Sequence, residues 1–558
     1  MLRDGTAGAP PIGDTVLSKL AEPFVSKVAV LAAFAILVVL AFTRNVNWDE
    51  FYFLSHVHAH LDGRLDRPLQ TAFVHAFGWL NIIPGHEMAQ IATGRLVMTG
   101  FLAVTCLSIF HMAHALAGNR AAWIAVATFL ASGFTLAHGA SFRADPMAAA
   151  GLMASLAIML NSRMAFGHII AVAALSAAAL LVTIKAGLFL PAYLGVLAWR
   201  MREPQIALRI LAAGVLGVAL AAAGFMLHAS GINTTSDTSA AGNMTNALGV
   251  TLLESGLLPR GEEALLWVLL SVGAFALAWF GITRSETRQM WLLFSFVAPM
   301  ILSILFYRNA FVYFFPFIAA PAMVAVAVGA ARLGAGQALG ALMALILATG
   351  AGQAIRAASE GSELQRATLA EVHRLFPQPV AYIDHNAMIS SFPRKGFFMS
   401  TWGMINYRSE GRLVMADLLA DTQPPLLLAN RWALHQAMTS TEIVDNAFSL
   451  LPEDQTTLRE AYVHYSGAIW LAGRKIQLSP EPTEIILPID GSYQIRSNAP
   501  LLVDGTKMQD GDVIEVSGLL QLAAITASTE VTFIWYSGQE LAPAMLPQTN
   551  LYVGFWGL

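Results

Sequence analysis

The sequence predicts a polytopic α-helical membrane protein of about eleven spans, followed by a C-terminal region with α/β and β-sandwich character outside the membrane. Of the 558 residues, 56% are hydrophobic and only 12% are charged, and the mean hydropathy is +0.59. A soluble domain carries about 25% charged residues. Long apolar runs continue up to residue 352, and charges and prolines become frequent from residue 353 onward. These observations set the fold class.

The apolar runs define a transmembrane module at residues 1–352, because a helix needs about 20 apolar residues to cross a bilayer. The first run lacks a small-residue cleavage site, so we expect it to stay as an anchor. The single cysteine, Cys106, lies in an apolar run and allows no internal disulfide. We expect spans at roughly 24–42, 92–117, 120–138, 145–161, 167–184, 187–200, 206–228, 264–282, 289–306, 310–331 and 335–352.

Basic residues in alternate loops predict the orientation, since cytoplasmic loops of membrane proteins are enriched in Lys and Arg. If the N-terminus is cytoplasmic, an odd number of spans places the C-terminal region outside. We therefore expect a multi-pass protein of the cytoplasmic (inner) membrane with an extracytoplasmic C-terminal domain. The loops on the predicted cytoplasmic side carry Arg120, Arg163, Arg200, Arg202, Arg209, Arg284, Arg288 and Arg332.

Two outer loops are long. In the loop at 45–91, Phe51, Leu54, Val57 and Leu61 recur at helical spacing, which predicts an amphipathic helix in the membrane interface. The loop at 229–262 is polar, and its composition is compatible with a lid or with a simple tether.

The chain after the last predicted span divides into two expected units. A small α/β region at 353–474 is indicated by short apolar strands at 380–384 and 425–429. A β-rich domain at 475–558 follows, with a sandwich expected at about 475–540. Its turns are marked by Asp-Gly pairs, and its strands are expected at 483–487, 493–495 and 531–536, after a strand at 468–472.

Charged residues gather at the predicted outer ends of the spans. Asp49 and Glu50 directly follow the first span, and ionisable groups near a bilayer are functional candidates. The same acids would also suit the first turn of a helix. Asp145 precedes Pro146 and could cap its span. Lys185 and Arg308 could instead extend to the interface without a chemical role.

The order of these motifs resembles the GT-C superfamily of membrane glycosyltransferases, in particular the protein O-mannosyltransferases and the lipid A aminoarabinose transferases. The resemblance covers about residues 20–330. In that family an acidic pair follows the first span, and a helix and a basic Pro-containing segment come next. The matching residues are Asp49-Glu50, Asp66-Arg67-Pro68-Leu69, Asp145, Lys185-Ala186-Gly187 with Pro191, and Arg308 with Tyr313, Pro316 and Pro321.

The resemblance implies an inverting glycosyltransferase that moves a sugar from a polyprenyl-phosphate donor to an acceptor hydroxyl on a glycan, lipid or protein. A carboxylate serves as general base, a role that we assign to Asp49, while Glu50 or Asp145 orients the acceptor or the sugar. Cations stabilise the leaving phosphate. The expected phosphate-binding residues are Lys185 and Arg308, with Arg67 and Arg143 behind them, and the expected substrate-binding residues are Tyr52, His75 and Tyr313.

No cofactor and no nucleic-acid partner are expected. The partners implied are the lipid-linked donor, the acceptor and the bilayer. A divalent metal is the weaker alternative, because His56 and His60 are four residues apart and a nearby acid could complete a site. Other histidines of the same loop are His58, His75 and His86.

Two other classes of protein are the alternatives to a transferase. A transporter or flippase of lipid-linked sugars is expected to show related halves or ionisable groups at mid-bilayer, whereas the charges singled out here fall on one side of the membrane. A structural subunit would explain the C-terminal region but not these charges. The sequence therefore favours the transferase.

Overall fold

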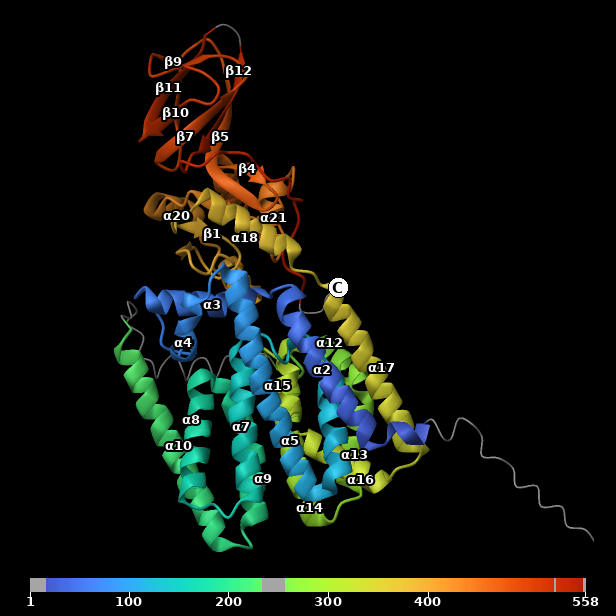
Figure 1. Cartoon of the computed structure of the whole chain (residues 1–558). Helices are drawn as coiled ribbons and strands as arrows, with labels where there is room; N and C mark the ends of the chain where they lie inside the picture. The colour runs from blue at the N-terminus through green and yellow to red at the C-terminus, as the bar shows by residue number, and fades with distance from the viewer. Residues whose placement is uncertain (1–16, 233–255, 526–527, 555–558) are drawn as a thin grey trace, which may run out of the picture.

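The computed structural model describes residues 17–232, 256–525 and 528–554. A bundle of long helices forms one end of the molecule, and a C-terminal region of helices and strands is stacked on it (Figure 1). We call residues 360–554 the head, and the end of the bundle that carries it the head side. The β-rich part of the head lies farthest from the bundle.

The bundle consists of helices that follow the apolar runs of the sequence. They are α2 (Pro23–Thr43), α5 (Glu87–Ala131), α7 (Ala144–Asn161), α8 (Phe166–Val182), α9 (Leu190–Arg200), α10 (Pro204–Ser230), α12 (Gly261–Leu270), α13 (Val272–Thr283), α14 (Thr287–Phe306), α15 (Phe315–Ala319), α16 (Met323–Leu333) and α17 (Gln337–Ser359). Short helices connect them: α3 (Trp48–Leu61), α4 (Val74–Phe77), η1 (Gly78–Ile82), α6 (Thr135–His138), η2 (Ile184–Phe189) and η3 (Val312–Phe314).

The number of spans stays a prediction. Among the described residues, six helices are long and apolar enough to cross a membrane, or up to eight if each bent pair is one span. The predicted spans at 92–117 and 120–138 are joined in α5, which is interrupted at Gly118 by non-helical backbone angles (φ 82°, ψ 173°). Glycine adopts this positive φ without the Cβ clash that other residues suffer.

Two predicted spans are bent. The helices α12 and α13 meet at 82°, and the segment Val312–Ala319 meets α16 at 63°. The helices α13 and α16 approach closely at Gly281 and Gly329, where a side chain on either residue would collide with the backbone of the other helix. Small residues permit such contact between membrane helices. This packing therefore holds α13 and α16, the second helix of each bent pair, against one another.

The helix α3 is the predicted amphipathic helix, and it lies across the head side of the bundle (Figure 1). Its apolar residues Phe51, Leu54 and Val57 are fully buried. They belong to one core with Val372 of the head. Protein therefore covers the apolar face that we expected to lie in the membrane interface, and only Leu61 at the end of the helix is 47% exposed.

The head begins with α18 and continues as a mixture of helices and strands. Its first part contains α18 (Glu363–Leu375), β1 (Tyr382–Ile383), β2 (Arg394–Lys395), α19 (Thr401–Glu410), α20 (Met415–Thr422), β3 (Leu426–Leu428), α21 (Trp432–Thr439), α22 (Pro452–Ala461) and β4 (Tyr462–Ser466). The remaining strands are β5 (Ile469–Leu478), β6 (Thr483–Ile486), β7 (Gly491–Ser497), β8 (Leu501–Val503), β9 (Thr506–Met508), β10 (Val513–Val516), β11 (Leu519–Ala524) and β12 (Thr529–Trp535).

One long strand joins the two expected units of the head. The strand β5 pairs with β3 and β4 of the first unit and with β12 of the second, so the strands form an eight-stranded sheet in the order β10-β7-β12-β5-β3-β1-β2, with β4 beside β5. A four-stranded sheet, β6-β11-β8-β9, forms the second layer of the β-rich part. The predicted division between residues 474 and 475 falls inside β5.

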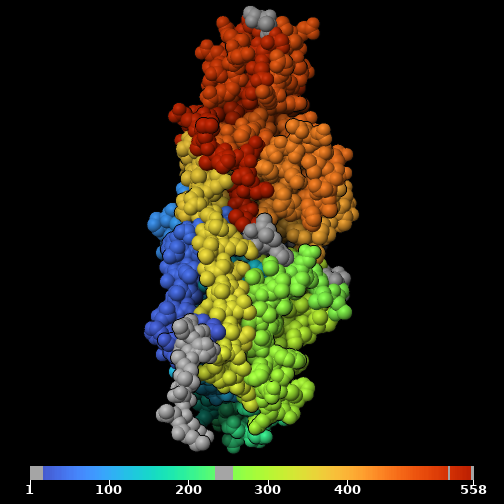
Figure 2. Space-filling model, turned by 90° about the vertical axis from the view of Figure 1, so that its right-hand side faces the viewer, coloured from blue at the N-terminus to red at the C-terminus, as the bar shows by residue number. Residues whose placement is uncertain are grey.

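The C-terminal segment returns from the β-rich part to the bundle, and its path is visible in dark red in Figure 2. There Asn45 donates a hydrogen bond to the carbonyl of Leu551 (3.1 Å) and accepts one from the backbone N–H of Val553 (3.2 Å). Gln365 at the start of α18 bonds to both backbone groups of Val46 (2.8 Å each). Both ends of the head therefore hold the segment that leads into α3.

Candidate active site

The start of α3 is fixed by a capping box. The side chain of Asn47 accepts a hydrogen bond from the Asp49 N–H (2.9 Å), and the Glu50 carboxylate accepts one from the Asn47 N–H (3.1 Å). Both bonds satisfy donors that a helix N-terminus would otherwise leave free. Asp49 and Glu50 therefore lie in the first turn of a helix, as one of the two interpretations of the acidic pair predicted.

Glu50 forms a buried ion pair with Arg95, a residue inside the predicted span 92–117. Its oxygens accept from Arg95 Nη2 (2.6 Å) and Nε (2.8 Å), and one of them also accepts from the Phe142 N–H (2.8 Å). The side chains of Glu50 and Arg95 are 0% and 5% exposed. Burial alone would raise the pKa of Glu50, but the Arg95 guanidinium outweighs it and the pKa lies below its ordinary value.

Asp49 points into a different cluster, which we call the four-charge cluster: Asp49, Arg143, Asp145 and Lys185. Arg143 Nη1 lies 2.8 Å from Asp49 Oδ2, and Arg143 Nε lies 3.5 Å from Asp145 Oδ2. Lys185 Nζ lies 2.8 Å from Asp145 Oδ1. Residues from three separate segments thus form one chain of alternating charge.

Each segment presents its charge from a helix end on the head side. The helix α7 begins at Ala144, so Arg143 occupies the position before it and Asp145 lies in its first turn. Asp145 is therefore not the residue that caps this helix, contrary to the alternative raised by Pro146. Lys185 lies in the short helix η2, whose start is capped by Thr183 (Lys185 N–H to Thr183 Oγ1, 3.3 Å).

An aromatic side chain covers the cluster. The guanidinium carbon of Arg143 lies 3.4 Å from the centre of the Tyr313 ring, and Lys185 Nζ lies 5.6 Å from it. Cations over a ring face are attracted by its quadrupole. Tyr313, expected to contact substrate, therefore contacts both cations of the cluster.

Arg308 contacts the head. Its guanidinium carbon lies 3.9 Å from the ring centre of Trp402 in α19. Arg260, which follows the polar part of the second outer loop, lies 5.5 Å from the same ring and donates to the Arg308 carbonyl (3.2 Å).

The charged groups of the site have shifted pKa values. Burial raises the pKa of the Asp49 carboxyl above its ordinary value, against the opposing charges of Arg143 and Lys185. Burial lowers and Asp49 raises the pKa of Arg143, and the net shift is upward. A carboxylate whose pKa is raised binds a proton more readily, so Asp49 has the property that a general base needs.

The other expected residues lie along α3 and beside it. Tyr52 is one turn after Asp49, and its hydroxyl lies 3.5 Å from Nη1 of Arg67, whose side chain is 60% exposed. His75 Nε2 lies 2.8 Å from Nδ1 of His228 at the end of α10. No contact between these residues and the four-charge cluster is seen among the described residues.

A large apolar cavity adjoins Lys185. Its volume is about 590 Å³, and its lining includes Ala186 and Gly187, which directly follow Lys185. Side chains of α7, α8, α9 and α10 form the rest of the wall, almost all of them apolar. A lipid chain suits such a space.

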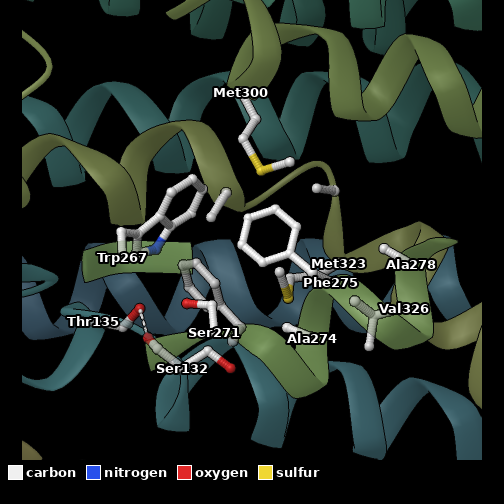
Figure 3. A pocket seen from close by; sticks show the side chains of 13 residues that line it. Ser132, Thr135, Trp267, Ser271, Ala274, Phe275, Ala278, Met300, Met323 and Val326 are labelled. Carbon is white, nitrogen blue, oxygen red and sulfur yellow. Dashed lines mark hydrogen bonds between the residues drawn. The ribbon is translucent and has the colours of Figure 1, made fainter. Parts of the chain in front are cut away.

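Two other cavities are too small for a substrate. One, lined by Asp145, Pro146 and Tyr313, has a volume of about 10 Å³. The other, shown in Figure 3, lies between Trp267 and Met323 and measures about 20 Å³, which is room for about one water molecule. A common cavity joining Asp49, Asp145, Lys185 and Arg308 thus stays a prediction.

The second outer loop, predicted at 229–262, lies mostly outside the described residues, and its role as lid or tether is not decided. Among the described residues, His56 and His60 belong to no group of three convergent ligand atoms, which the weaker metal alternative required. Within the described ranges, the single group of at least three metal-ligating side chains with convergent ligand atoms is His86, Glu87 and His373.

Sequence reasoning missed Arg95 and Trp402. A charged residue inside an apolar span is itself a signal, so Arg95, which lies within the predicted span 92–117, could have been singled out. Trp402 had no such signal, since it lies 94 residues after Arg308 in the sequence and contacts it only through the fold.

The structure is similar to solved structures of membrane glycosyltransferases. Two crystal structures of ArnT from Cupriavidus metallidurans, a lipid A aminoarabinose transferase, match with TM-scores of 0.52 (bound to undecaprenyl phosphate, 13% identity) and 0.51 (apo state, 14% identity). Each match covers 72% of this chain and 92% of ArnT. The apo oligosaccharyltransferase of Archaeoglobus fulgidus matches with a TM-score of 0.50 at 11% identity, over 87% of this chain and 74% of that one.

No protein-family model and no curated protein sequence matches this chain. At identities below 15%, the similarity is one of fold. The chain is a polytopic membrane protein with a strand-rich C-terminal region, and it has the fold of the GT-C glycosyltransferases. The resemblance inferred from the order of the motifs is therefore confirmed for the fold.

Proposed function

We propose that this protein is an inverting glycosyltransferase that moves a sugar from a polyprenyl-phosphate donor to an acceptor hydroxyl at the outer face of the cytoplasmic membrane. The observation that carries the proposal is the position of the four-charge cluster beside the large apolar cavity. A lipid tail in that cavity would bring its phosphate to Lys185, because the cavity wall begins at the next residue.

Lys185 and Arg308 are the proposed phosphate-binding residues. As the bond between the anomeric carbon and the phosphate oxygen breaks, its electron pair stays on the phosphate, and nearby cations stabilise this growing charge. Lys185 already pairs with Asp145, so Asp145 would hold the ammonium in place. Arg308, stacked on Trp402, would reach the phosphate from the other side, with Arg143 and Arg67 as additional cations.

Asp49 is the proposed base. The acceptor oxygen attacks the anomeric carbon from the face opposite the phosphate, and its proton passes to Asp49. One displacement of this kind inverts the anomeric configuration. Asp49 is 16% exposed, whereas Glu50 is fully enclosed by fixed hydrogen-bond donors. We therefore assign Glu50 the role of fixing the start of α3. Substrate contact is the proposed role of Tyr52, His75 and Tyr313.

A direct test uses purified protein in lipid bilayers with polyprenyl phosphates that carry different sugars, namely mannose, arabinofuranose, galacturonic acid and aminoarabinose. Release of free polyprenyl phosphate that requires an acceptor, with inverted configuration at the anomeric carbon of the product, is the expected result. Movement of intact donor across the bilayer without cleavage would instead establish the flippase alternative. Asp417→Asn, which changes an exposed carboxylate of α20, is the matched control for substitutions of site acids.

The orientation can be tested separately. Thr506 is exposed in β9 of the head, and the single native cysteine, Cys106, is buried. A Thr506→Cys variant should therefore react with an impermeant thiol reagent in intact cells. Labelling that occurs only after lysis would place the head in the cytoplasm and contradict the proposed side of the reaction.

A further inference from the structure

A second polar site lies where α5 of the bundle meets α18 of the head. Glu87 is the first residue of α5, His86 precedes it, and His373 belongs to α18. One ligand atom from each of the three side chains lies within 4.8 Å of the others. We propose that these residues bind a divalent metal ion of the zinc class, which fastens the head to the bundle.

The residue types suit this ion. Two imidazoles and a carboxylate are an established ligand set for Zn²⁺, with a water in the fourth position. Glu87 is 1% exposed and His373 is 14% exposed, whereas His86 lies at the surface. The site is thus anchored on its inner side and open on its outer side, which gives the ion an entry path.

The carboxylate is already oriented by a neighbouring group. One oxygen of Glu87 accepts hydrogen bonds from the hydroxyl (2.6 Å) and the backbone N–H (3.2 Å) of Ser391. The other oxygen lies 2.9 Å from Nε2 of His373. Such supporting hydrogen bonds fix ligand orientation in metal sites. Ser391 leaves the second carboxylate oxygen directed toward the histidines.

Binding needs a modest movement of His86. Ligand atoms about 2.0–2.1 Å from a tetrahedral ion lie roughly 3.4 Å from one another. The rings of His86 and His373 are now stacked at 3.8 Å with 5° between their planes, so one ring must turn for both nitrogens to face the ion. His86 is exposed and outside the helix.

The site connects to the helix that carries Asp49. Ser390, next to Ser391, donates a hydrogen bond to the carbonyl of Phe51 in α3 (2.8 Å). One short segment of the head therefore contacts both the metal-binding carboxylate and α3. A metal ion at this place would stabilise the docked position of the head without taking part in the transfer reaction.

The experiment measures metal binding by the full-length protein in lipid nanodiscs, purified with a tag that contains no histidine and treated with a chelator. Zn²⁺ is measured by mass spectrometry after dialysis, and Co²⁺ serves as a spectroscopic probe. We expect one equivalent of bound metal, a tetrahedral Co²⁺ spectrum and an unfolding midpoint that rises with Zn²⁺ concentration. His168→Gln, at an exposed histidine of α8, should change none of these.

Glu87→Gln and His373→Gln should weaken Zn²⁺ binding by more than the ~10–100-fold that loss of a supporting partner costs, and Ser391→Ala should fall within that range. If the buried variants fail to fold, His86→Asn provides the test, because it changes a surface residue and leaves the fold intact. It should also weaken Zn²⁺ binding. Zn²⁺ binding by His86→Asn that equals the wild type would overturn the proposal. So would a wild-type protein that binds no Zn²⁺ at micromolar concentration.

Discussion

Asp49 and Glu50 follow the first span side by side, but their carboxylates lie in two different clusters. Glu50 faces Arg95 of α5 and accepts hydrogen bonds from two backbone N–H groups as well. Asp49 faces Arg143 and belongs to the four-charge cluster near the apolar cavity. Neighbouring residues in a helix point about 100° apart, so one turn of chain supplies both a structural acid and an accessible one.

The two pKa shifts have opposite signs. Fixed donors satisfy the ionised form of Glu50 and lower its pKa, whereas burial raises that of Asp49. The contribution of Glu50 to the free energy of unfolding is fully present above the pKa that this group has in the unfolded chain, and it is lost as the pH falls through its pKa in the folded protein. For Asp49, the folded state is favoured at low pH, and this contribution is lost as the pH rises through the folded pKa. Ionisation of Glu50 therefore favours the folded state, whereas ionisation of Asp49 disfavours it.

The largest expected effect comes from Glu50→Gln. It leaves the buried Arg95 guanidinium without a counter-charge, and breaking a buried ion pair from one side costs roughly 3–5 kcal/mol. We expect a large drop in the thermal unfolding midpoint and in the yield of folded protein. Asp417→Asn should leave both unchanged. A Glu50→Gln protein as stable as wild type would contradict the structural role of the Glu50–Arg95 ion pair.

Asp49→Asn should reduce the turnover number by at least ~10²-fold, the usual contribution of a positioned acid–base group. The unfolding midpoint should fall less than in Glu50→Gln, because Arg143 keeps Asp145 as a second counter-charge. Donor binding should survive, since the proposed phosphate contacts lie elsewhere. Turnover, midpoint and donor binding are measured on the same preparation. Full turnover, or loss of folding, would mean that Asp49 resembles Glu50 after all.

Arg308→Ala should lower turnover by about 10–100-fold, the range that corresponds to a charge-assisted hydrogen bond of roughly 1.5–3 kcal/mol. Arg308→Lys should restore only part of this, because an ammonium cannot pair two phosphate oxygens or stack on Trp402 as a guanidinium does. Rates of polyprenyl-phosphate release are normalised to the folded fraction. If Lys replaced Arg freely, Arg308 would have only an interfacial role.

The smallest effect concerns pH. The acid limb of kcat/KM should lie above the ordinary pKa of an aspartate, since Asp49 must be ionised to act and burial raises its pKa. Asp145 adds to this upward shift through its own negative charge. Asp145→Asn should therefore move the acid limb to lower pH, whatever its effect on the maximal rate. An unchanged or higher limb would show that another group controls the profile.

The helices of the bundle and the charges at their ends could be predicted from the sequence. Apolar runs predict the helices and basic loops predict the side on which each helix ends, because insertion of a helix into a bilayer depends on composition along one dimension. The charges of Asp49, Arg143, Asp145 and Lys185 were expected on one face for that reason, and the structure brings these four together.

The tertiary structure alone decided which charges meet. Hydropathy gives the ends of a helix but not its rotation about its axis, so the pairing of Glu50 with Arg95 and of Asp49 with Arg143 could not be read from spacing. The same holds for contacts across the chain, such as Arg308 on Trp402 and the head covering α3. These depend on how helices and head pack against one another, which is a property of the whole fold.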